Sequence, residues 1–252
     1  MYQLLRYGVA LSVALFALSA NADLQQELDN LAPGSSFQLP PETLSPLAIR
    51  VPGVSVSCAP ETVIDGGGHG NAVEILAEAI TFSGCQVRNW GKDLNELDAG
   101  IFVAREAKGA VVENNRLQGP AFGVWLDATP DVTVRENHIR GDTSLRSQDR
   151  GNGIHLFNTT GALIEGNDIS ETRDAIYIET ANRNTIRGNV MSDLRYGIHY
   201  MYSMHNLLEN NVTRGTRTGY ALMQSKYLKV FNNRSENDEN YGILMNFITN
   251  SE

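Results

Sequence analysis

The sequence predicts an all-β protein, a right-handed parallel β-helix in which short strands wind into coils of about 22 residues. From Gly100 onward one pattern recurs: a small residue, an apolar residue, any residue, an apolar residue and, about fourteen positions after the start, an asparagine. Successive starts lie 22 or 23 residues apart, except for one interval of 30. Apolar and polar residues alternate within each repeat, which is typical of half-buried strands. The starts are Gly100, Gly123, Gly153, Ala175, Gly197, Gly219 and Gly242.

Residues 1–22 are expected to be a secretory signal peptide. Arg6 gives a positive start, residues 9–20 form an apolar run, and a small-x-small tripeptide ends at Ala22. The run is too short to span a bilayer stably. We therefore expect cleavage after Ala22 and a mature chain outside the cytoplasm.

The remaining chain is expected to hold an N-terminal cap and one long solenoid. Residues 23–48 lack the repeat and would cover the open first coil, which otherwise exposes strand edges. Residues 49–252 are assigned to the β-helix, and the last coil is expected to be incomplete at the C-terminus. Within it, the polar stretch 142–150 accounts for the interval of 30 and is expected to be a surface loop.

The net charge of the chain limits the functions that it can have. The net charge is −9 at pH 7, and loss of the signal removes one arginine and no acidic residue. Nucleic-acid binding needs a concentrated basic face, so this class is excluded.

The two cysteines, Cys58 and Cys85, follow similar strand-like runs. In an exported chain they are expected to form a structural disulfide or a buried pair.

The recurring asparagines are expected to be structural. At a tight corner an asparagine tolerates unusual backbone angles, and its amide can bond the asparagine of the next coil. We expect this column to stabilise the stack and to have no binding role. Its members are Asn114, Asn137, Asn167, Asn189, Asn211 and Asn233.

The alternation also predicts which side chains face outward. The second position after each start reads Phe102, Trp125, His155, Tyr177, His199, Ala221 and Leu244. The fourth reads Ala104, Asp127, Phe157, Glu179, Met201, Met223 and Asn246. His199 and Met201 then share an outer face, about 6.6 Å apart along the strand. Met223 is expected beside Met201, one coil further on. Inward positions hold Met191, Tyr200 and Met245.

These outward residues suggest a copper site. Met204 and His205 follow at the next corner, so the candidate ligands are His199, Met201, Met204, His205 and Met223. Thioether sulfur is a soft ligand that selects Cu(I), and imidazole also suits copper, whereas zinc and calcium favour thiolates or carboxylates. A partner-binding strip and packing beneath a loop remain alternatives for the same residues.

A carbohydrate-active enzyme or sugar binder is the alternative function, since parallel β-helices often carry polysaccharide lyases and epimerases. His155, Tyr177 and His199 stack in one outward column and would suit proton abstraction from a uronate. That column contains no carboxylate, so no catalytic residues are assigned. The sequence has no phosphate-binding loop or dinucleotide fingerprint.

Several segments resemble a known family. They read "DAGIFV", "RGNGIHLFNT", "RYGIHYMYSMHN" and "GYALMQS". In these segments the chain resembles the NosD family, the periplasmic β-helix proteins of the nitrous oxide reductase maturation system. The resemblance extends over most of residues 23–252.

The resemblance implies a non-enzymatic, periplasmic role in copper handling and partner docking. Family members work with an ABC transporter made of an ATPase and a membrane subunit. They receive copper from a lipoprotein chaperone and support assembly of the copper centres of nitrous oxide reductase. The family is also longer, with further coils and a C-terminal part that engages the membrane subunit. The five copper ligands named above come from the residue pattern and not from the resemblance.

Overall fold

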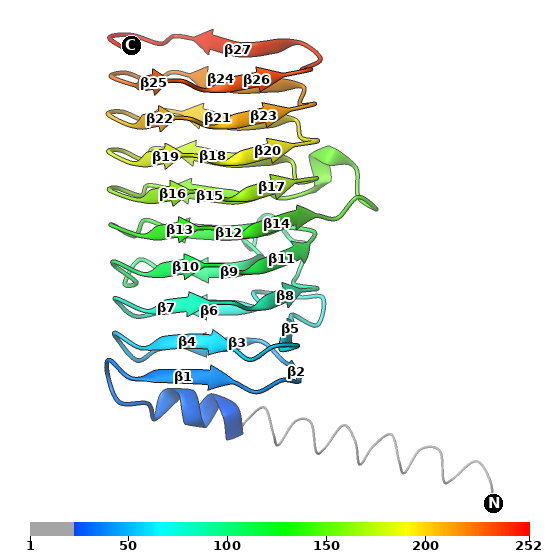
Figure 1. Ribbon diagram of the computed structural model, residues 1–252, viewed down its shortest axis with the longest axis vertical. Helices are drawn as coiled ribbons and strands as arrows, with labels where there is room; N and C mark the ends of the chain where they lie inside the picture. The colour runs from blue at the N-terminus through cyan, green and yellow to red at the C-terminus, as the bar shows by residue number, and fades with distance from the viewer. Residues whose placement is uncertain (1–22) are drawn as a thin grey trace, which may run out of the picture.

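The computed structural model describes residues 23–252, which form a solenoid of stacked parallel strands (Figure 1). The strands make three parallel sheets, here called A, B and C, of nine strands each. Every coil contributes one strand to each sheet, so each strand pairs with the third strand after it along the chain. The predicted parallel β-helix with a repeat of about 22 residues is confirmed.

The strands are short. Sheet A contains β1 (Ser36–Leu39), β4 (Ser55–Cys58), β7 (Thr81–Ser83), β10 (Val111–Glu113), β13 (Thr133–Arg135), β16 (Leu163–Glu165), β19 (Thr185–Arg187), β22 (Leu207–Glu209) and β25 (Lys229–Phe231). Sheet B contains β2 (Thr43–Leu44), β5 (Val63–Asp65), β8 (Gln86–Arg88), β11 (Arg116–Gly119), β14 (His138–Gly141), β17 (Asp168–Ser170), β20 (Val190–Ser192), β23 (Val212–Arg214) and β26 (Arg234–Glu236). Sheet C contains β3 (Leu47–Ile49), β6 (Val73–Ile75), β9 (Ala99–Val103), β12 (Phe122–Asp127), β15 (Ile154–Phe157), β18 (Asp174–Glu179), β21 (Tyr196–Met201), β24 (Thr218–Met223) and β27 (Tyr241–Asn246).

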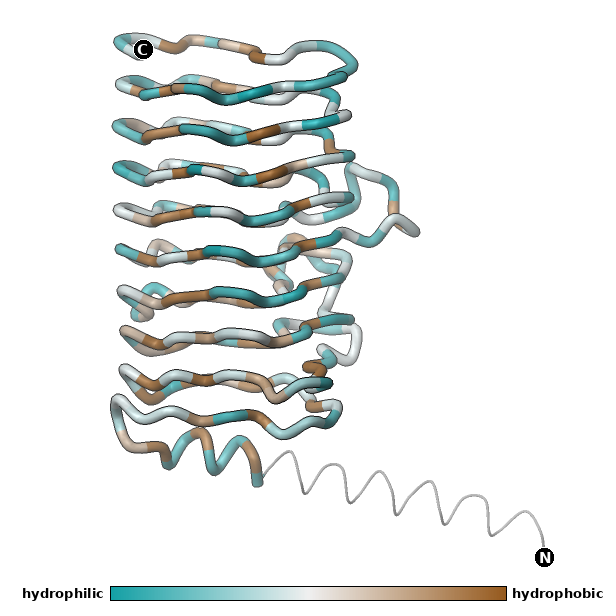
Figure 2. The backbone as a smooth tube through the Cα atoms, in the orientation of Figure 1, coloured by the Kyte–Doolittle hydropathy of each residue, from teal (hydrophilic) through white to brown (hydrophobic). Residues whose placement is uncertain are grey.

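The core fills the inside of the coils. Figure 2 shows apolar and polar positions alternating along the coils, as expected for strands with one buried face. Tyr200 and Met191 are fully buried, as predicted from the alternation. Met245 continues the inward column of Tyr200, but its predicted burial is wrong: the residue is 68% exposed because β27 is the outermost strand of sheet C. One inward column of sheet C reads Leu126, Leu156, Ile178, Tyr200 and Leu222.

Close contact between coils explains the small residue that begins each repeat. A Cβ atom at Gly123 would lie 2.5 Å from the carbonyl oxygen of Gly153. A Cβ atom at Gly153 would likewise lie 2.7 Å from the carbonyl oxygen of Ala175. A side chain at either position would therefore force the coils apart, so these two positions require glycine. In the next coil Ala175, which is fully buried, occupies the corresponding place.

The asparagine column forms a hydrogen-bonded ladder, with one correction to its membership. The Oδ1 atom of Asn137 accepts hydrogen bonds from the backbone N–H and from Nδ2 of Asn115, both at 3.0 Å. Asn114, the predicted first member, is instead exposed and has a φ of 56°. The coil that starts at Gly100 has one additional residue before this corner, between β9 and β10, which moves the ladder position from Asn114 to Asn115. The remaining members are Asn137, Asn167, Asn189, Asn211 and Asn233, as predicted.

The N-terminal part of the described chain contacts the first coils. Residues 23–29 form a helical segment, and the side-chain amide of Gln25 exchanges two hydrogen bonds with the backbone of Ala48. The range 23–48 thus holds this helix together with the first coil, which begins at β1. The Cys58–Cys85 pair forms a disulfide between neighbouring coils.

The predicted signal peptide, residues 1–22, lies outside the described residues. Among residues 23–252, no helix combines the length and the apolar character needed to cross a membrane.

Candidate functional site on the outer face of sheet C

The outward columns of sheet C have the predicted register. Trp125, His155, Tyr177 and His199 follow one another on adjacent strands, as expected. Two residues further along β21, Met201 pairs with Glu179 on one side and with Met223 on the other. Strand pairing spaces such neighbours about 4.8 Å apart. The residues of the two outward columns therefore lie side by side on one surface.

The structure brings three of the five candidate copper ligands onto this face. Met201 ends β21 and Met223 ends β24, and both thioether side chains are half-buried. His199 precedes Met201 by two residues, so its imidazole faces the same side of the sheet. The three side chains form what we call the thioether patch: His199, Met201 and Met223.

The other two candidates lie on the turn that follows β21. Met204 is 41% exposed and forms an isolated parallel β-bridge with Lys226 of the next coil. The ring of His205 stacks on Tyr227, with ring centroids 4.7 Å apart and an interplanar angle of 3°. These two residues are therefore next to the patch along the chain but not on its strand face.

A buried carboxylate holds His199. Its Nδ1 atom lies 3.0 Å from Oδ2 of Asp174, whose side chain is 1% exposed. Arg195 donates two hydrogen bonds to the same carboxylate, at 2.8 Å and 2.6 Å. Burial alone would raise the pKa of Asp174, but the hydrogen bonds from Arg195 and His199 lower it below its usual value. The carboxylate is therefore ionised beside the imidazole.

This arrangement fixes the ring of His199. An Nδ1–H that donates to Asp174 leaves the lone pair on Nε2, which is the form of histidine that binds metals. Within residues 23–252, no group of three or more His, Cys, Asp or Glu side chains could hold a metal ion. The thioether patch belongs to a different donor class, in which one imidazole joins two sulfur atoms.

The acidic partners of the histidine column come from outside it. The column itself contains no carboxylate, as expected. Asp174 begins β18 and reaches His199 of the next coil, while Oε2 of Glu179 lies 3.6 Å from Nε2 of His155. The sequence offered a signal for Asp174, because it directly follows Arg173 at a strand start.

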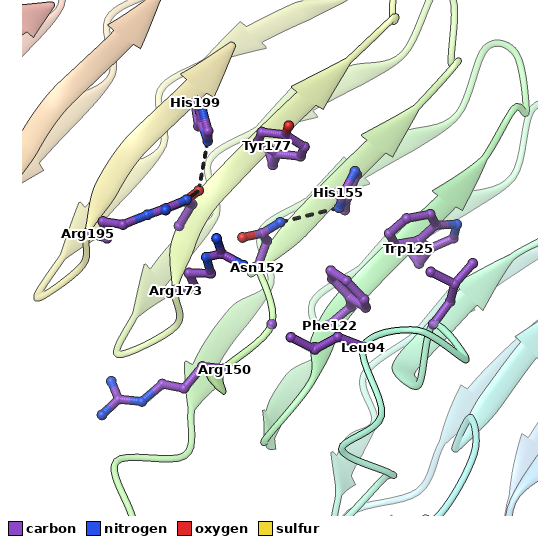
Figure 3. Close-up of a pocket in the computed structure, with 13 residues that line it drawn as sticks. Leu94, Phe122, Trp125, Arg150, Asn152, His155, Arg173, Tyr177, Arg195 and His199 are labelled. Carbon is purple, nitrogen blue, oxygen red and sulfur yellow. Dashed lines mark hydrogen bonds and ion pairs between the residues drawn. The ribbon is translucent and has the colours of Figure 1, made fainter. Parts of the chain in front are cut away.

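A cleft of about 320 Å³ opens beside the patch on the same face (Figure 3). Its floor consists of side chains from four neighbouring strands: Phe122, Trp125, His155, Tyr177 and His199. Residues from two connections between sheets B and C complete its lining, one connection running through 91–98 and the other through 142–152. The first contributes Leu94 and Leu97, and the second contributes Arg150 and Asn152.

The floor of the cleft is a continuous row of rings. Centroids lie 4.1 Å apart for Trp125 and His155, 4.7 Å for His155 and Tyr177, and 4.5 Å for Tyr177 and His199. Burial lowers the pKa of His155, although Glu179 opposes this shift. Burial also raises the pKa of Tyr177 to about 12. Both rings are therefore neutral near pH 7.

The inserted stretch 142–150 has a role that the sequence did not predict. It was expected to be a surface loop, and it does project from the solenoid (Figure 1). Its last residue, Arg150, also lines the cleft and donates hydrogen bonds to the carbonyl groups of Leu145 and of Glu171, which follows β17. The only sequence signal was the longer interval between repeats.

The sequence comparisons identify relatives of this chain. Residues 135–252 match a family model described as "Periplasmic copper-binding protein (NosD)". A protein of Pseudomonas aeruginosa, named "Probable ABC transporter binding protein NosD", is 61% identical over 77% of this chain and 45% of its own length. A protein of the same name from Stutzerimonas stutzeri is 46% identical over 98% of this chain and 57% of its own length. The chain thus spans about half the length of these curated relatives.

Solved structures share the fold at low sequence identity. An alginate lyase from Paenibacillus sp. str. FPU-7 superposes with a TM-score of 0.68 at 14% identity, over 90% of this chain and 97% of its own. The A-module of a mannuronan C-5 epimerase from Azotobacter vinelandii gives a TM-score of 0.64 at 13% identity, over 90% and 75%. Likeness at this level of identity establishes the β-helix architecture alone.

Proposed function

Because the chain belongs to the NosD family, we propose that it handles copper as Cu(I) and docks partner proteins during the maturation of nitrous oxide reductase. The observation that carries the copper part is the pairing of Met201 with Met223 beside His199 on one outer face of sheet C. The copper ion is cargo in this proposal. The family model's description as a periplasmic copper-binding protein supports it.

The donor set of the thioether patch fits Cu(I). Two thioethers supply soft sulfur ligands, and His199 supplies Nε2 while Asp174 holds its Nδ1. Half-exposed methionines on a strand leave apolar surface in water, which gives them little structural advantage at these positions. Two sulfur atoms and one nitrogen leave room for a further ligand from a partner. Incomplete ligation suits a relay, since a closed site would retain the ion.

Exposed apolar side chains next to the patch suit docking. Tyr202 is 52% exposed, Met204 41% and Tyr227 45%, and all three lie on turns that follow β21 and β24. Apolar groups gathered on a surface are typical of protein contact sites. Met204 and His205 lie on the same edge and would supply further donors when a partner arrives.

The partners we propose follow from the family. They are the ABC transporter's ATPase and membrane subunits, the copper chaperone lipoprotein and nitrous oxide reductase itself. The curated relatives are named as probable ABC transporter binding proteins, which supports the transporter part. The proposed location is the periplasm, and the proposed role is not catalytic.

A Cu(I) titration tests the copper proposal. The Met201→Leu/Met223→Leu double variant keeps the apolar volume of both side chains and removes both sulfur atoms, so we expect much weaker Cu(I) binding. Met245→Leu is the matched control, because it removes an exposed methionine of the same sheet outside the patch. Unchanged Cu(I) affinity in the double variant would reject the patch. The Met204→Leu/His205→Gln variant measures separately what the turn contributes.

A further inference from the structure

The cleft beside the patch contains several buried polar atoms without a hydrogen-bond partner. They are Nε1 of Trp125, Oδ1 of Asn152 and Nε of Arg173. The residues Trp125 and Asn152 are 5% and 7% exposed. An unpaired buried polar atom costs about 1–3 kcal/mol, so three of them around one cleft point to a missing ligand.

The charge of the cleft favours an anion, although the whole chain carries −9. Arg195 is neutralised by Asp174, and Arg150 is engaged with backbone carbonyl groups. The backbone of Arg173 is hydrogen-bonded to Gly151 and Arg195, but its side chain makes no hydrogen bond or ion pair with the other residues that line the cleft (Figure 3). Its guanidinium is therefore free to bind a carboxylate, whose two oxygen atoms can accept hydrogen bonds from two N–H groups of the planar guanidinium.

The mixture of donors and acceptors says more about the ligand. Nδ2 of Asn152 contacts Nδ1 of His155 at 3.3 Å, which leaves its Oδ1 as an acceptor that needs a donor. A bare anion has no such donor, whereas a hydroxyl group both donates and accepts. Trp125 and Arg173 offer donors, so the ligand must also accept. A molecule with hydroxyl groups and a carboxylate meets all of these requirements.

Size and shape select a small molecule over a protein surface. A volume of about 320 Å³ is at the lower end of the range for small-molecule sites, about 300–1,000 Å³. The unpaired atoms are buried, so a ligand has to enter the cleft to reach them. Leu94, Leu97 and Phe122 line the cleft with apolar surface that suits the C–H face of a ring.

We propose that this cleft binds a uronate, a sugar whose ring carries a carboxylate. The carboxylate pairs with the guanidinium of Arg173, and ring hydroxyl groups bond to Oδ1 of Asn152 and Nε1 of Trp125. The loops 91–98 and 142–152 hold the sugar against the ring row of sheet C. This site is separate from the two methionines of the thioether patch and does not depend on copper.

Isothermal titration of residues 23–252 with defined mannuronate and glucuronate oligomers tests the proposal. We expect binding of at least one uronate oligomer and none of a neutral mannose oligomer of equal length. Arg173→Gln should weaken that binding at least about tenfold, since it removes a charge-assisted pair. Arg217→Gln is the matched control, because Arg217 occupies the corresponding place two coils away and is exposed. Asn152→Ala should also weaken binding, and thermal melting of each variant checks that it folds.

Several results would overturn the proposal. These are no binding of any uronate, equal binding of the neutral oligomer, full retention of binding by Arg173→Gln, or preferential binding of citrate or an acidic peptide. The copper proposal is tested independently in the same experiments. Arg173→Gln should leave Cu(I) affinity unchanged, and Met201→Leu/Met223→Leu should leave uronate affinity unchanged.

Discussion

Oδ2 of Asp174 lies 3.0 Å from Nδ1 of His199, although the two residues belong to different coils. The same carboxylate receives two hydrogen bonds from Arg195, and its side chain is almost fully buried. One buried carboxylate thus serves two purposes. It fixes the ring of a candidate copper ligand, and it neutralises an arginine at the edge of the cleft.

Asp174→Asn is expected to destabilise the protein. The amide keeps the shape of the side chain but leaves Arg195 without its counter-charge in a partly buried place. Breaking a buried ion pair costs about 3 kcal/mol or more, so the free energy of unfolding should fall by about 3 kcal/mol. Urea denaturation measures this change. Asp193→Asn, at an exposed residue, is the control and should change stability by less than about 0.5 kcal/mol.

The same substitution should also weaken Cu(I) binding if His199 is a ligand. Loss of a carboxylate that orients a metal-bound histidine typically lowers metal affinity about 10–100-fold. Competition with a chromogenic Cu(I) chelator at neutral pH measures the affinity. Equal affinity in the wild-type chain and a folded Asp174→Asn variant would remove His199 from the proposed site.

The asparagine ladder makes a separate prediction about stability. Nδ2 of Asn189 donates to Oδ1 of Asn211 and to the carbonyl group of Ile164, and Oδ1 of Asn189 accepts from the backbone of Asn167. Asn189→Ala leaves these buried groups unpaired, at about 1–3 kcal/mol for each unsatisfied group. We expect a loss of at least about 2 kcal/mol in urea denaturation. Asn240→Ala, at an exposed position, should be nearly neutral.

The sequence predicted much of the fold because the repeat determines it. A coil of fixed length and a side-chain period of two place Met201 beside Met223 without any coordinates, and the observed register agrees. The same rule failed for Asn114, because one additional residue in its coil moves the ladder position to Asn115. Periodic reasoning is accurate only where the repeat length is constant.

The parts of the site that lie outside the outward columns could not be predicted from the sequence to the same extent. Asp174 reaches His199 diagonally from the start of its strand, so it belongs to none of the outward columns. The lining of the cleft includes residues of two loops, 91–98 and 142–152, whose sequences do not follow the repeat. Their conformation involves single contacts, such as the hydrogen bonds that Arg150 donates to Leu145 and Glu171, which the sequence alone does not reveal.

The disulfide is expected to contribute to stability in the first coils. Cys58 and Cys85 are 27 residues apart, and closing a loop of this length lowers the conformational entropy of the unfolded chain, which stabilises the folded state by about 3.5 kcal/mol. Reduction should lower the free energy of unfolding by about this amount in urea denaturation. A Cys58→Ser/Cys85→Ser variant should have the reduced stability and should not respond to reductant. A response of the double variant to reductant would show that the effect has another source.

Buried His155 should make stability depend on pH. Its pKa is lowered by burial, against the opposing effects of Glu179 and Asp174, so the unfolded chain takes up this proton first as the pH falls. The unfolded value is about 6.5, and stability should therefore decrease from pH 7 to pH 5, by at most about 1.4 kcal/mol per pH unit for this group. His155→Phe keeps a ring in the row and removes the titration, so its stability should fall less over the same range. His69→Asn, at an exposed site, is the control and should follow the wild-type slope. Identical slopes for wild type and His155→Phe in urea denaturation would show that His155 does not link folding to pH.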